Sequence, residues 1–284
     1  MTFAAHRARK RFGQHWLIDQ SVLDRIVAAA QLGPEDRVLE VGPGRGALTE
    51  RLLASPAASV QAVELDRDLV QGLRQRFSDD HRFHLIEGDA LVVALPAADK
   101  VVANIPYNIT GPLLDRLLGR LDRPVEPPYA RLVLLVQQEV GERIRARPGS
   151  SAYSALSVRM QLLAHCHSVC SVPPRCFQPP PKVMSEVIAL EPMAASDRLE
   201  PRLARAVESL LRRCFAARRK MLRNSLCGLV GDQELLAVAA EAGIDLQDRP
   251  QMLSPAQWVA LATALEPYGS QVQPSGGESS STEC

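Results

Sequence analysis

The feature that most constrains the fold is a repeated alternation, between residues 37 and 190, of short apolar runs with segments of helical periodicity. Apolar runs without alternating polar residues are typical of buried parallel strands, and apolar residues at helical spacing indicate amphipathic helices. Strands are expected at residues 37–41, 59–65, 83–86, 100–103, 131–137, 166–172 and 185–190, with helices at 21–30, 47–53, 112–118 and 154–163. Repeated strand–helix units predict an α/β fold with a mostly parallel, doubly wound sheet.

The character of the sequence changes after Glu191-Pro192, and the pattern from Glu200 to Leu265 is helical throughout. We therefore expect a sheet domain over residues 13–192 and a small helical domain over residues 199–266. A basic, flexible N-terminus over residues 1–12 precedes them. The last stretch, residues 269–284, is rich in Ser, Gly and Glu, which predicts disorder.

Charge and composition set limits on the class of protein. The chain has 284 residues, of which 46% are hydrophobic, and a net charge of only +1, so overall charge argues neither for nor against nucleic acid. Basic residues cluster at 7–11 and at 202–223, which fits either a phosphate-binding surface or a solvated helix face. No apolar run approaches the ~20 residues of a membrane span. The six cysteines show no paired framework, so we expect a cytoplasmic protein.

A polar break ends the strand expected at residues 100–103. Asn104, Pro106 and Tyr107 follow it, at the edge where ligands of open parallel sheets lie. An amide acceptor, a turn stiffened by proline and a flat ring suit a planar heterocycle with an amino group, such as adenine. An ordinary turn, in which the asparagine caps a helix and the proline restricts the backbone, explains the same residues. This stretch alone leaves both interpretations open.

A glycine-rich turn containing Gly42 and Gly44 follows the first strand and precedes a helix, as in nucleotide-binding proteins. Glu40, just before this turn, disfavours a pyrophosphate and so favours a cofactor without phosphates over a dinucleotide. Glu64 ends the second strand about 20 residues beyond Gly42, where an acid accepts hydrogen bonds from ribose hydroxyls. Asp89, after the third strand, can accept one from an adenine amino group, or it caps a helix.

Several motifs resemble those of a known enzyme family. The segments Glu40-Val41-Gly42-Pro43-Gly44, Val63-Glu64-Leu65-Asp66, Glu87-Gly88-Asp89-Ala90 and Asn104-Ile105-Pro106-Tyr107 stand in the order found in class I S-adenosylmethionine methyltransferases. More narrowly, they resemble the ribosomal RNA adenine dimethyltransferases, whose fold is Rossmann-like. Residues 9–17 are similar to that family's N-terminal signature, and residues 172–183 and 215–226 to signatures of its small-subunit (KsgA/RsmA) branch.

The resemblance implies dimethylation of two adjacent adenosines in a hairpin near the 3′ end of 16S ribosomal RNA, in a small-subunit assembly intermediate, with S-adenosyl-L-methionine as methyl donor. Asn104 and the Ile105 carbonyl would accept the amino hydrogens of the adenine. Tyr107 would stack on the base, and Phe177 would cover its other face or, alternatively, pack in the core.

The resemblance also implies two sets of binding residues. The donor would be contacted by His15, Leu17, Gly42, Gly44, Glu64, Asp89 and Asn104. The RNA would be contacted by Arg9, Lys10, Arg11, Arg143, Arg145, Arg147, Arg218, Arg219, Lys220 and Arg223. His15 departs from the family, in which asparagine is common, and Trp16 replaces a common phenylalanine.

Other functions compete with this interpretation. A large-subunit adenine methyltransferase of the antibiotic-resistance type would share the Asn104–Tyr107 chemistry. A ribosome-assembly factor could depend on binding more than on methylation. A nicotinamide dehydrogenase could use the glycine turn, but it does not explain Asn104-Ile105-Pro106-Tyr107. Residues 165–170 hold two histidines and two cysteines, but on a strand these point to opposite faces, so we expect no metal site. We expect a monomer.

Overall fold

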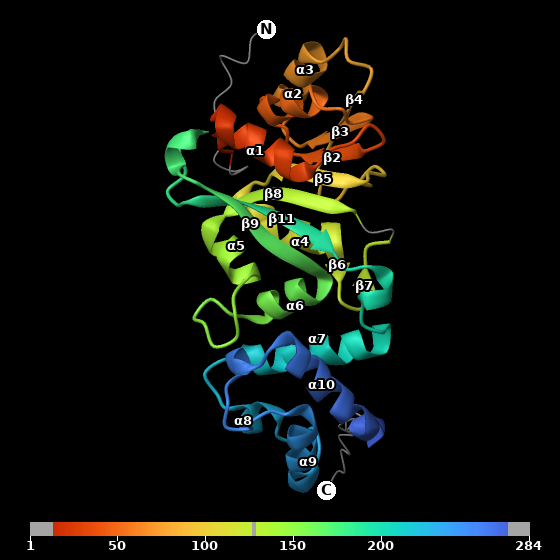
Figure 1. Cartoon of the computed structure of the whole chain (residues 1–284), viewed down its shortest axis with the longest axis vertical. Helices are drawn as coiled ribbons and strands as arrows, with labels where there is room; N and C mark the ends of the chain where they lie inside the picture. Colours follow the sequence, from red (N-terminus) through yellow and green to blue (C-terminus); the bar gives the residue numbers. More distant parts are fainter. Residues whose placement is uncertain (1–13, 127–128, 272–284) are drawn as a thin grey trace, which may run out of the picture. The chain divides into compact units, whose positions relative to one another are not determined.

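The computed structural model describes residues 14–126 and 129–271. The predicted N-terminal segment 1–12 and residues 272–284 of the predicted tail lie outside the described residues. The chain divides into two compact units (Figure 1). The first contains the chain up to Arg147 together with Ser151–Leu199, and the second contains Pro148–Ser150 and the chain from Glu200 onward.

The first unit is built on a seven-stranded sheet with the order β4-β3-β2-β5-β8-β11-β9. Its strands are β2 (Arg37–Val41), β3 (Ser59–Glu64), β4 (Phe83–Glu87), β5 (Lys100–Asn104), β8 (Arg131–Gln137), β9 (Ala164–Val172) and β11 (Ser185–Pro192). The first five run parallel to one another, and β11 is antiparallel to both β8 and β9. The predicted Rossmann-like, mostly parallel sheet is therefore confirmed.

Helices cover both faces of this sheet (Figure 1). They are α1 (Gln20–Ala30), α2 (Ala47–Leu53), α3 (Arg67–Arg76), α4 (Thr110–Leu118), α5 (Gln138–Ile144) and α6 (Ala155–Leu163). Helix α1 packs against α2 and against the strands β5, β8, β9 and β11, whereas α5 and α6 pack on the last strands from the other side. Because both faces are covered, β8 is buried at its five central positions, which explains its continuous apolar sequence.

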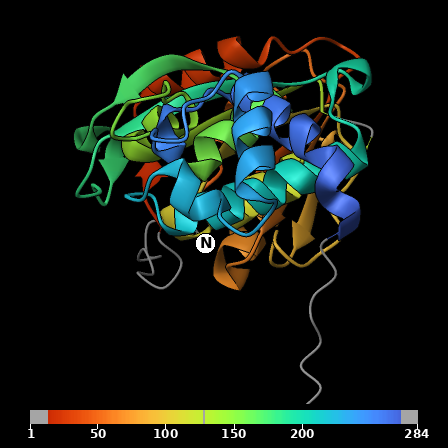
Figure 2. The ribbon, with the colours of Figure 1, turned by 90° about the horizontal axis from the view of Figure 1, so that it is seen from below.

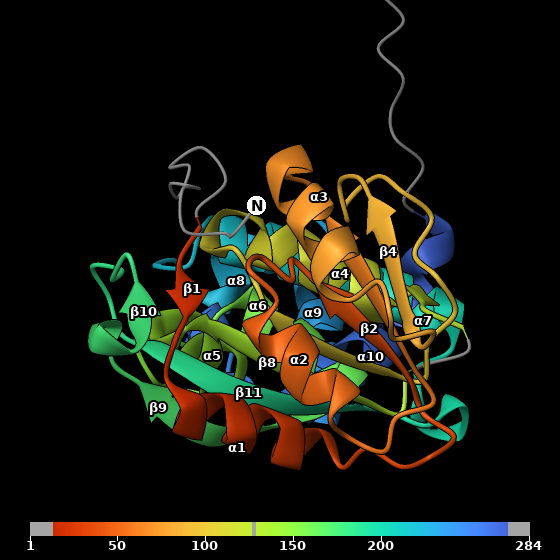
Figure 3. The same ribbon diagram turned by 90° about the horizontal axis from the view of Figure 1, so that it is seen from above.

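Short elements complete this unit. Strands β1 (Trp16–Leu17) and β10 (Phe177–Gln178) pair with each other and lie side by side in Figure 3, although they are far apart in the sequence. Strands β6 (Gly119–Arg120) and β7 (Arg123–Pro124) form a second small pair. Single 3₁₀ turns are η3 (Tyr107–Ile109), η4 (Pro174–Cys176) and η5 (Ala195–Asp197).

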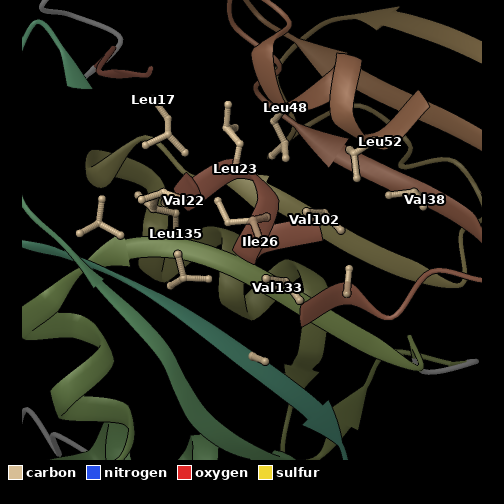
Figure 4. Packing of buried hydrophobic residues seen from close by; sticks show 14 of the residues in the cluster. Leu17, Val22, Leu23, Ile26, Val38, Leu48, Leu52, Val102, Val133 and Leu135 are labelled. Carbon is tan, nitrogen blue, oxygen red and sulfur yellow. The ribbon is translucent and has the colours of Figure 1, made fainter. Parts of the chain in front are cut away.

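The core on the α1 side is a cluster of interlocking aliphatic side chains (Figure 4). Leu23 and Ile26 of α1 point toward Val102 of β5 and Val133 and Leu135 of β8. All five side chains are fully or almost fully buried. Burial of such aliphatic side chains stabilises a fold by roughly 1.5–3 kcal/mol each, so α1 is fixed firmly on the sheet.

The second unit is helical over its described residues (cyan to blue in Figure 2). It consists of α7 (Pro201–Ala216), α8 (Leu222–Leu226), α9 (Asp232–Ala242) and α10 (Pro255–Leu265), with the 3₁₀ turns η6 (Pro250–Met252) and η7 (Glu266–Gln271). Helix α7 buries one apolar stripe, and Trp258 of α10 packs its indole 5.8 Å from the Phe215 ring. The helical pattern that the sequence predicts from residue 200 to 265 is present.

A carboxyl group lies buried in the sheet near the end of β2. Glu40 is 1% exposed, and its Oε2 accepts a hydrogen bond of 2.7 Å from the Thr49 hydroxyl. Burial raises the pKa of Glu40 to about 8, against the lowering effect of the Thr49 hydrogen bond and with a further increase from nearby Glu64. The folded chain therefore holds this carboxyl protonated at neutral pH.

The raised pKa of Glu40 predicts a pH-dependent stability. The unfolded chain releases this proton near pH 4.5 and the folded chain near pH 8, so stability falls as pH rises between these values, by about 1.4 kcal/mol per pH unit. Glu40→Gln keeps an acceptor for Thr49 and has no charge, so it should remove this slope. Urea unfolding from pH 5 to 8 measures it, and equal slopes in the two proteins would contradict the pKa assignment.

Candidate active site

A cavity of about 320 Å³ lies at the carboxyl ends of the parallel strands. It is lined by residues that directly follow the strands, namely Gly42 and Gly44 after β2, Leu65 after β3, Gly88–Ala90 after β4 and Ile105–Ile109 after β5, by the strand-end residues Glu64 and Asn104, and by Gln14–Trp16. Of the predicted catalytic and donor-binding residues, it brings together His15, Gly42, Gly44, Glu64, Asp89, Asn104, Ile105 and Tyr107. Leu17 and Phe177 do not line it.

The glycine turn packs closely against the end of β3 and against Trp16. The Gly42 N–H donates 2.9 Å to the Val63 carbonyl of β3, and the Gly44 N–H donates 3.0 Å to Glu64 Oε2. Gly44 has φ +59°, and a Cβ there would lie 2.9 Å from Trp16 Cδ1. Glycine is required at this position because both the backbone conformation and the close indole exclude a side chain.

Glu64 is a buried acceptor at the edge of the cavity. Besides the Gly44 N–H, its carboxylate accepts a hydrogen bond of 2.8 Å from the Asp66 N–H. Burial raises the pKa of Glu64, while these backbone hydrogen bonds act in the opposite direction. Each carboxylate oxygen has further lone pairs, so the group can also accept from a pair of ligand hydroxyls.

The far end of the cavity combines one carboxylate with apolar surface. Asp89 Oδ1 accepts a hydrogen bond of 2.8 Å from the Leu91 N–H, but no α-helix begins there, so Asp89 does not act as a helix cap. Leu65 is 46% exposed beside it, and Ala90 adds a second apolar wall. An exposed leucine next to an acid suits a flat ring with an amino group at its edge.

Asn104 is held in one orientation by the N-terminal segment. Its Nδ2 donates a hydrogen bond of 3.0 Å to the backbone carbonyl of His15. The amide oxygen is therefore the end of the group that remains for a ligand in the cavity. Ile105 follows with its side chain buried and its N–H bonded to the Leu135 carbonyl at 3.2 Å, so it can act on a ligand through its backbone.

Tyr107 presents a fixed ring to the same cavity. Its hydroxyl lies 2.5 Å from the Ser185 hydroxyl, and the His15 imidazole stacks on it with ring centroids 5.6 Å apart and planes 25° apart. Burial raises the pKa of Tyr107, against the effect of the Ser185 hydrogen bond. The phenol is thus neutral at physiological pH and acts as a flat, partly buried surface.

Residues 14–17 form a strap across the cavity that the sequence only partly revealed. Gln14 Nε2 donates to Asp66 Oδ2 at 3.0 Å, and His15 Nδ1 lies 2.8 Å from the Pro179 carbonyl. The Arg45 guanidinium lies 3.8 Å above the Trp16 ring, a cation–π contact. His15 thus contacts the site through its backbone carbonyl and its ring, a geometry with no signal in the local sequence.

The side chains of Phe177 and of Leu17, the last residue of the strap, are buried in the core. They are cross-strand partners in the β1–β10 pair, and both belong to the buried cluster that includes Val22. The Phe177 ring is 3% exposed. A stacking role would require this ring to leave the core, and that role stays a prediction.

The predicted RNA-contacting residues fall into distinct environments. Arg145 is bonded to the buried Glu186 at 2.7 Å, and Arg143 pairs with Glu139 one helical turn away. In the second unit, Arg219, Lys220 and Arg223 are exposed. Arg147 is exposed and Arg218 half-buried, whereas Arg9, Lys10 and Arg11 lie outside the described residues.

Over residues 14–126 and 129–271, no group of three or more His, Cys, Asp or Glu side chains is arranged to hold a metal ion. In the same part of the chain, every helix is too short or too polar to cross a membrane.

Comparison with curated proteins finds close relatives. The chain is 71% identical over 270 residues to the ribosomal RNA small subunit methyltransferase A of Parasynechococcus marenigrum (strain WH8102), covering 93% of this chain and 89% of the relative. It is 68% identical to the protein of the same name from Synechococcus sp. (strain CC9605), covering 93% and 98%.

Solved structures agree with this result. A dimethyladenosine transferase from Plasmodium falciparum superimposes with a TM-score of 0.76 at 28% identity, covering 90% of this chain and 98% of that one. The 23S rRNA methyltransferase ErmE superimposes with a TM-score of 0.71 at 29% identity, covering 88% and 99%. The family described as ribosomal RNA adenine dimethylase matches residues 5–266. This chain belongs to the ribosomal RNA adenine dimethylase family.

Proposed function

We propose that this protein dimethylates the N6 amino groups of two adjacent adenosines in a hairpin loop near the 3′ end of 16S ribosomal RNA, during small-subunit biogenesis, with S-adenosyl-L-methionine as donor. The observation that carries the proposal is the Asn104 amide, which the His15 carbonyl fixes beside a cavity lined by the buried acid Glu64. Relatives named for the small subunit, at 68–71% identity, favour that ribosomal subunit.

The donor end of the cavity fits an adenosine without phosphates. Glu64, Asp89 and Leu65 all line the cavity. Glu64 would accept hydrogen bonds from the two ribose hydroxyls, Asp89 would accept one from the adenine amino group, and Leu65 would lie against the ring face. Phosphates would be repelled by these two acids, whereas hydroxyl and amino donors are matched by them. The donor supplies a sulfonium methyl group and leaves as a neutral thioether.

The acceptor end orients a weak nucleophile. The adenine amino nitrogen delocalises its lone pair into the ring, so it must be rehybridised and aimed at the methyl group. Asn104 Oδ1 and the Ile105 carbonyl accept hydrogen bonds from the two amino hydrogens, and Tyr107 stacks on the base. When the methyl group moves from sulfur to nitrogen, the nitrogen becomes cationic and releases one proton to solvent. Base–aromatic stacking contributes ~1–3 kcal/mol, and an adenine in a hairpin loop leaves its stack more cheaply than one in a duplex. No strong base is needed.

In this proposal, the helical unit provides a surface that binds RNA. Arg219, Lys220 and Arg223 are exposed on and before α8, and such cations contact phosphates without reading sequence. Unit 1 would carry the chemistry on the base. The protein would act as a monomer in the cytoplasm, where ribosomal subunits assemble.

Methyl transfer from labelled donor tests the substrate. We expect incorporation into small subunits that lack the modification, at two adjacent adenines of the 3′ hairpin, with mature small subunits and large subunits as controls. Mapping the modified bases identifies the positions. Incorporation into large-subunit RNA alone would assign the protein to the antibiotic-resistance type. A protein that restores subunit maturation without incorporation would be an assembly factor.

Asn104→Ala should abolish methyl transfer and weaken donor binding by a much smaller factor, because the variant also removes the hydrogen bond to the His15 carbonyl. The variant removes the oxygen that accepts a hydrogen bond from the adenine amino group. Misorientation of a reacting group can lower the rate by roughly 100-fold or more. Calorimetric titration with the donor serves as the control, because the donor-binding acids Glu64 and Asp89 stay in place. Turnover near that of the unchanged protein would contradict the assignment of Asn104.

Asp89→Asn should weaken donor binding roughly 10- to 100-fold, the range expected for loss of one charge-assisted hydrogen bond. Its kcat at saturating donor should fall much less. Asp79→Asn, which changes an exposed carboxylate outside the cavity, is the matched control. Equal donor affinity in the two variants would remove Asp89 from the donor site.

A further inference from the structure

Ser185 is a buried hydroxyl that directly contacts the acceptor end of the site, and nothing in the sequence analysis singled it out. It is fully buried at the first position of β11. Its Oγ lies 2.5 Å from the Tyr107 hydroxyl, and within residues 14–126 and 129–271 each of these hydroxyls is the other's only side-chain partner. Buried hydroxyls are costly to leave unpaired, so this contact is maintained in the folded protein.

The backbone of Ser185 is held within the sheet, whereas the backbone of Tyr107 lies in a turn outside it. The serine is in register with Gln137 of β8 and with Val172 of β9, so its backbone is held from both sides in the sheet. Tyr107 begins the 3₁₀ turn η3, which follows the end of β5 and has no side-chain cap. The tyrosine therefore takes its ring position from side-chain contacts, which are the Ser185 hydroxyl at its tip and the His15 imidazole on one face.

We propose that Ser185 is a positioning residue for methyl transfer. It holds the tip of the Tyr107 ring, and so sets the plane on which the acceptor adenine stacks and the direction in which its amino group meets Asn104 Oδ1. The base stacks on the face of Tyr107 that His15 leaves open. This inference rests on the proposed function, because it needs a flat acceptor base at Tyr107.

A positioning role has a distinct kinetic pattern. Ser185→Ala releases the ring tip, and reacting groups misplaced by about 1 Å lose rate roughly 100-fold, so kcat should fall about 10- to 100-fold. Donor affinity should not change, because the donor-binding acids Glu64 and Asp89 are not contacted by Ser185. The KM for RNA should change less than about threefold, because phosphate contacts dominate affinity.

The hydrogen bond itself is isolated by a double-mutant cycle. Tyr107→Phe removes the same bond from the other side with the loss of one oxygen, and should lower kcat by a similar factor. The double variant should be no slower than the slower single variant, because a bond can be removed only once. If Ser185→Ala does not fold, Tyr107→Phe still tests the bond.

A matched control separates positioning from stability. Ser157→Ala removes an equally buried hydroxyl of the same unit, which donates to the Arg143 carbonyl, and should lower the melting temperature without lowering kcat per folded molecule. Normal kcat in folded Ser185→Ala, or multiplied losses in the double variant, would overturn the inference and leave the proposed function intact. An unchanged protein that does not methylate small-subunit RNA would overturn both.

Discussion

The hydrogen bond from Asn104 Nδ2 to the His15 carbonyl is the interaction on which the rest of the site depends. A side-chain amide has a donor end and an acceptor end, and only a partner decides which of them faces a ligand. Here the partner is a backbone carbonyl 3.0 Å away. That carbonyl is held in place because the next residues, Trp16 and Leu17, pair with Gln178 and Phe177. A two-residue strand pair therefore fixes the polarity of the acceptor site.

Two acids are buried near the carboxyl ends of β2 and β3, and their surroundings differ. Glu40 carries its proton to about pH 8, because burial outweighs the Thr49 hydrogen bond. Glu64 instead receives two backbone N–H donors and faces the cavity. Burial raises the pKa of Glu64 as well, but these two backbone hydrogen bonds oppose that shift. One acid is thus a neutral part of the core, and the other is the acceptor available to a ligand.

The sequence predicts what depends on local pattern and misses what depends on distant partners. Strands such as β8 are recognisable because burial on both faces leaves an unbroken apolar run. The β1–β10 pair is too short for any periodicity, so the burial of Phe177 could not be distinguished from a stacking role. Ser185 gave no signal, because a serine at the first position of a predicted strand looks like a solvent-facing residue. Arginine content likewise does not reveal that Arg145 is bonded to Glu186.

That last ion pair bears on which of the proposed arginines can contact RNA. Glu186 is buried, so pulling Arg145 away to contact a phosphate would leave an uncompensated charge, at a cost of about 3–5 kcal/mol. Arg219, Lys220 and Arg223 are exposed and form no ion pair within the described chain, so they can bind phosphates without that cost. Among the proposed RNA contacts, these three are therefore better suited to bind phosphates than Arg145 is.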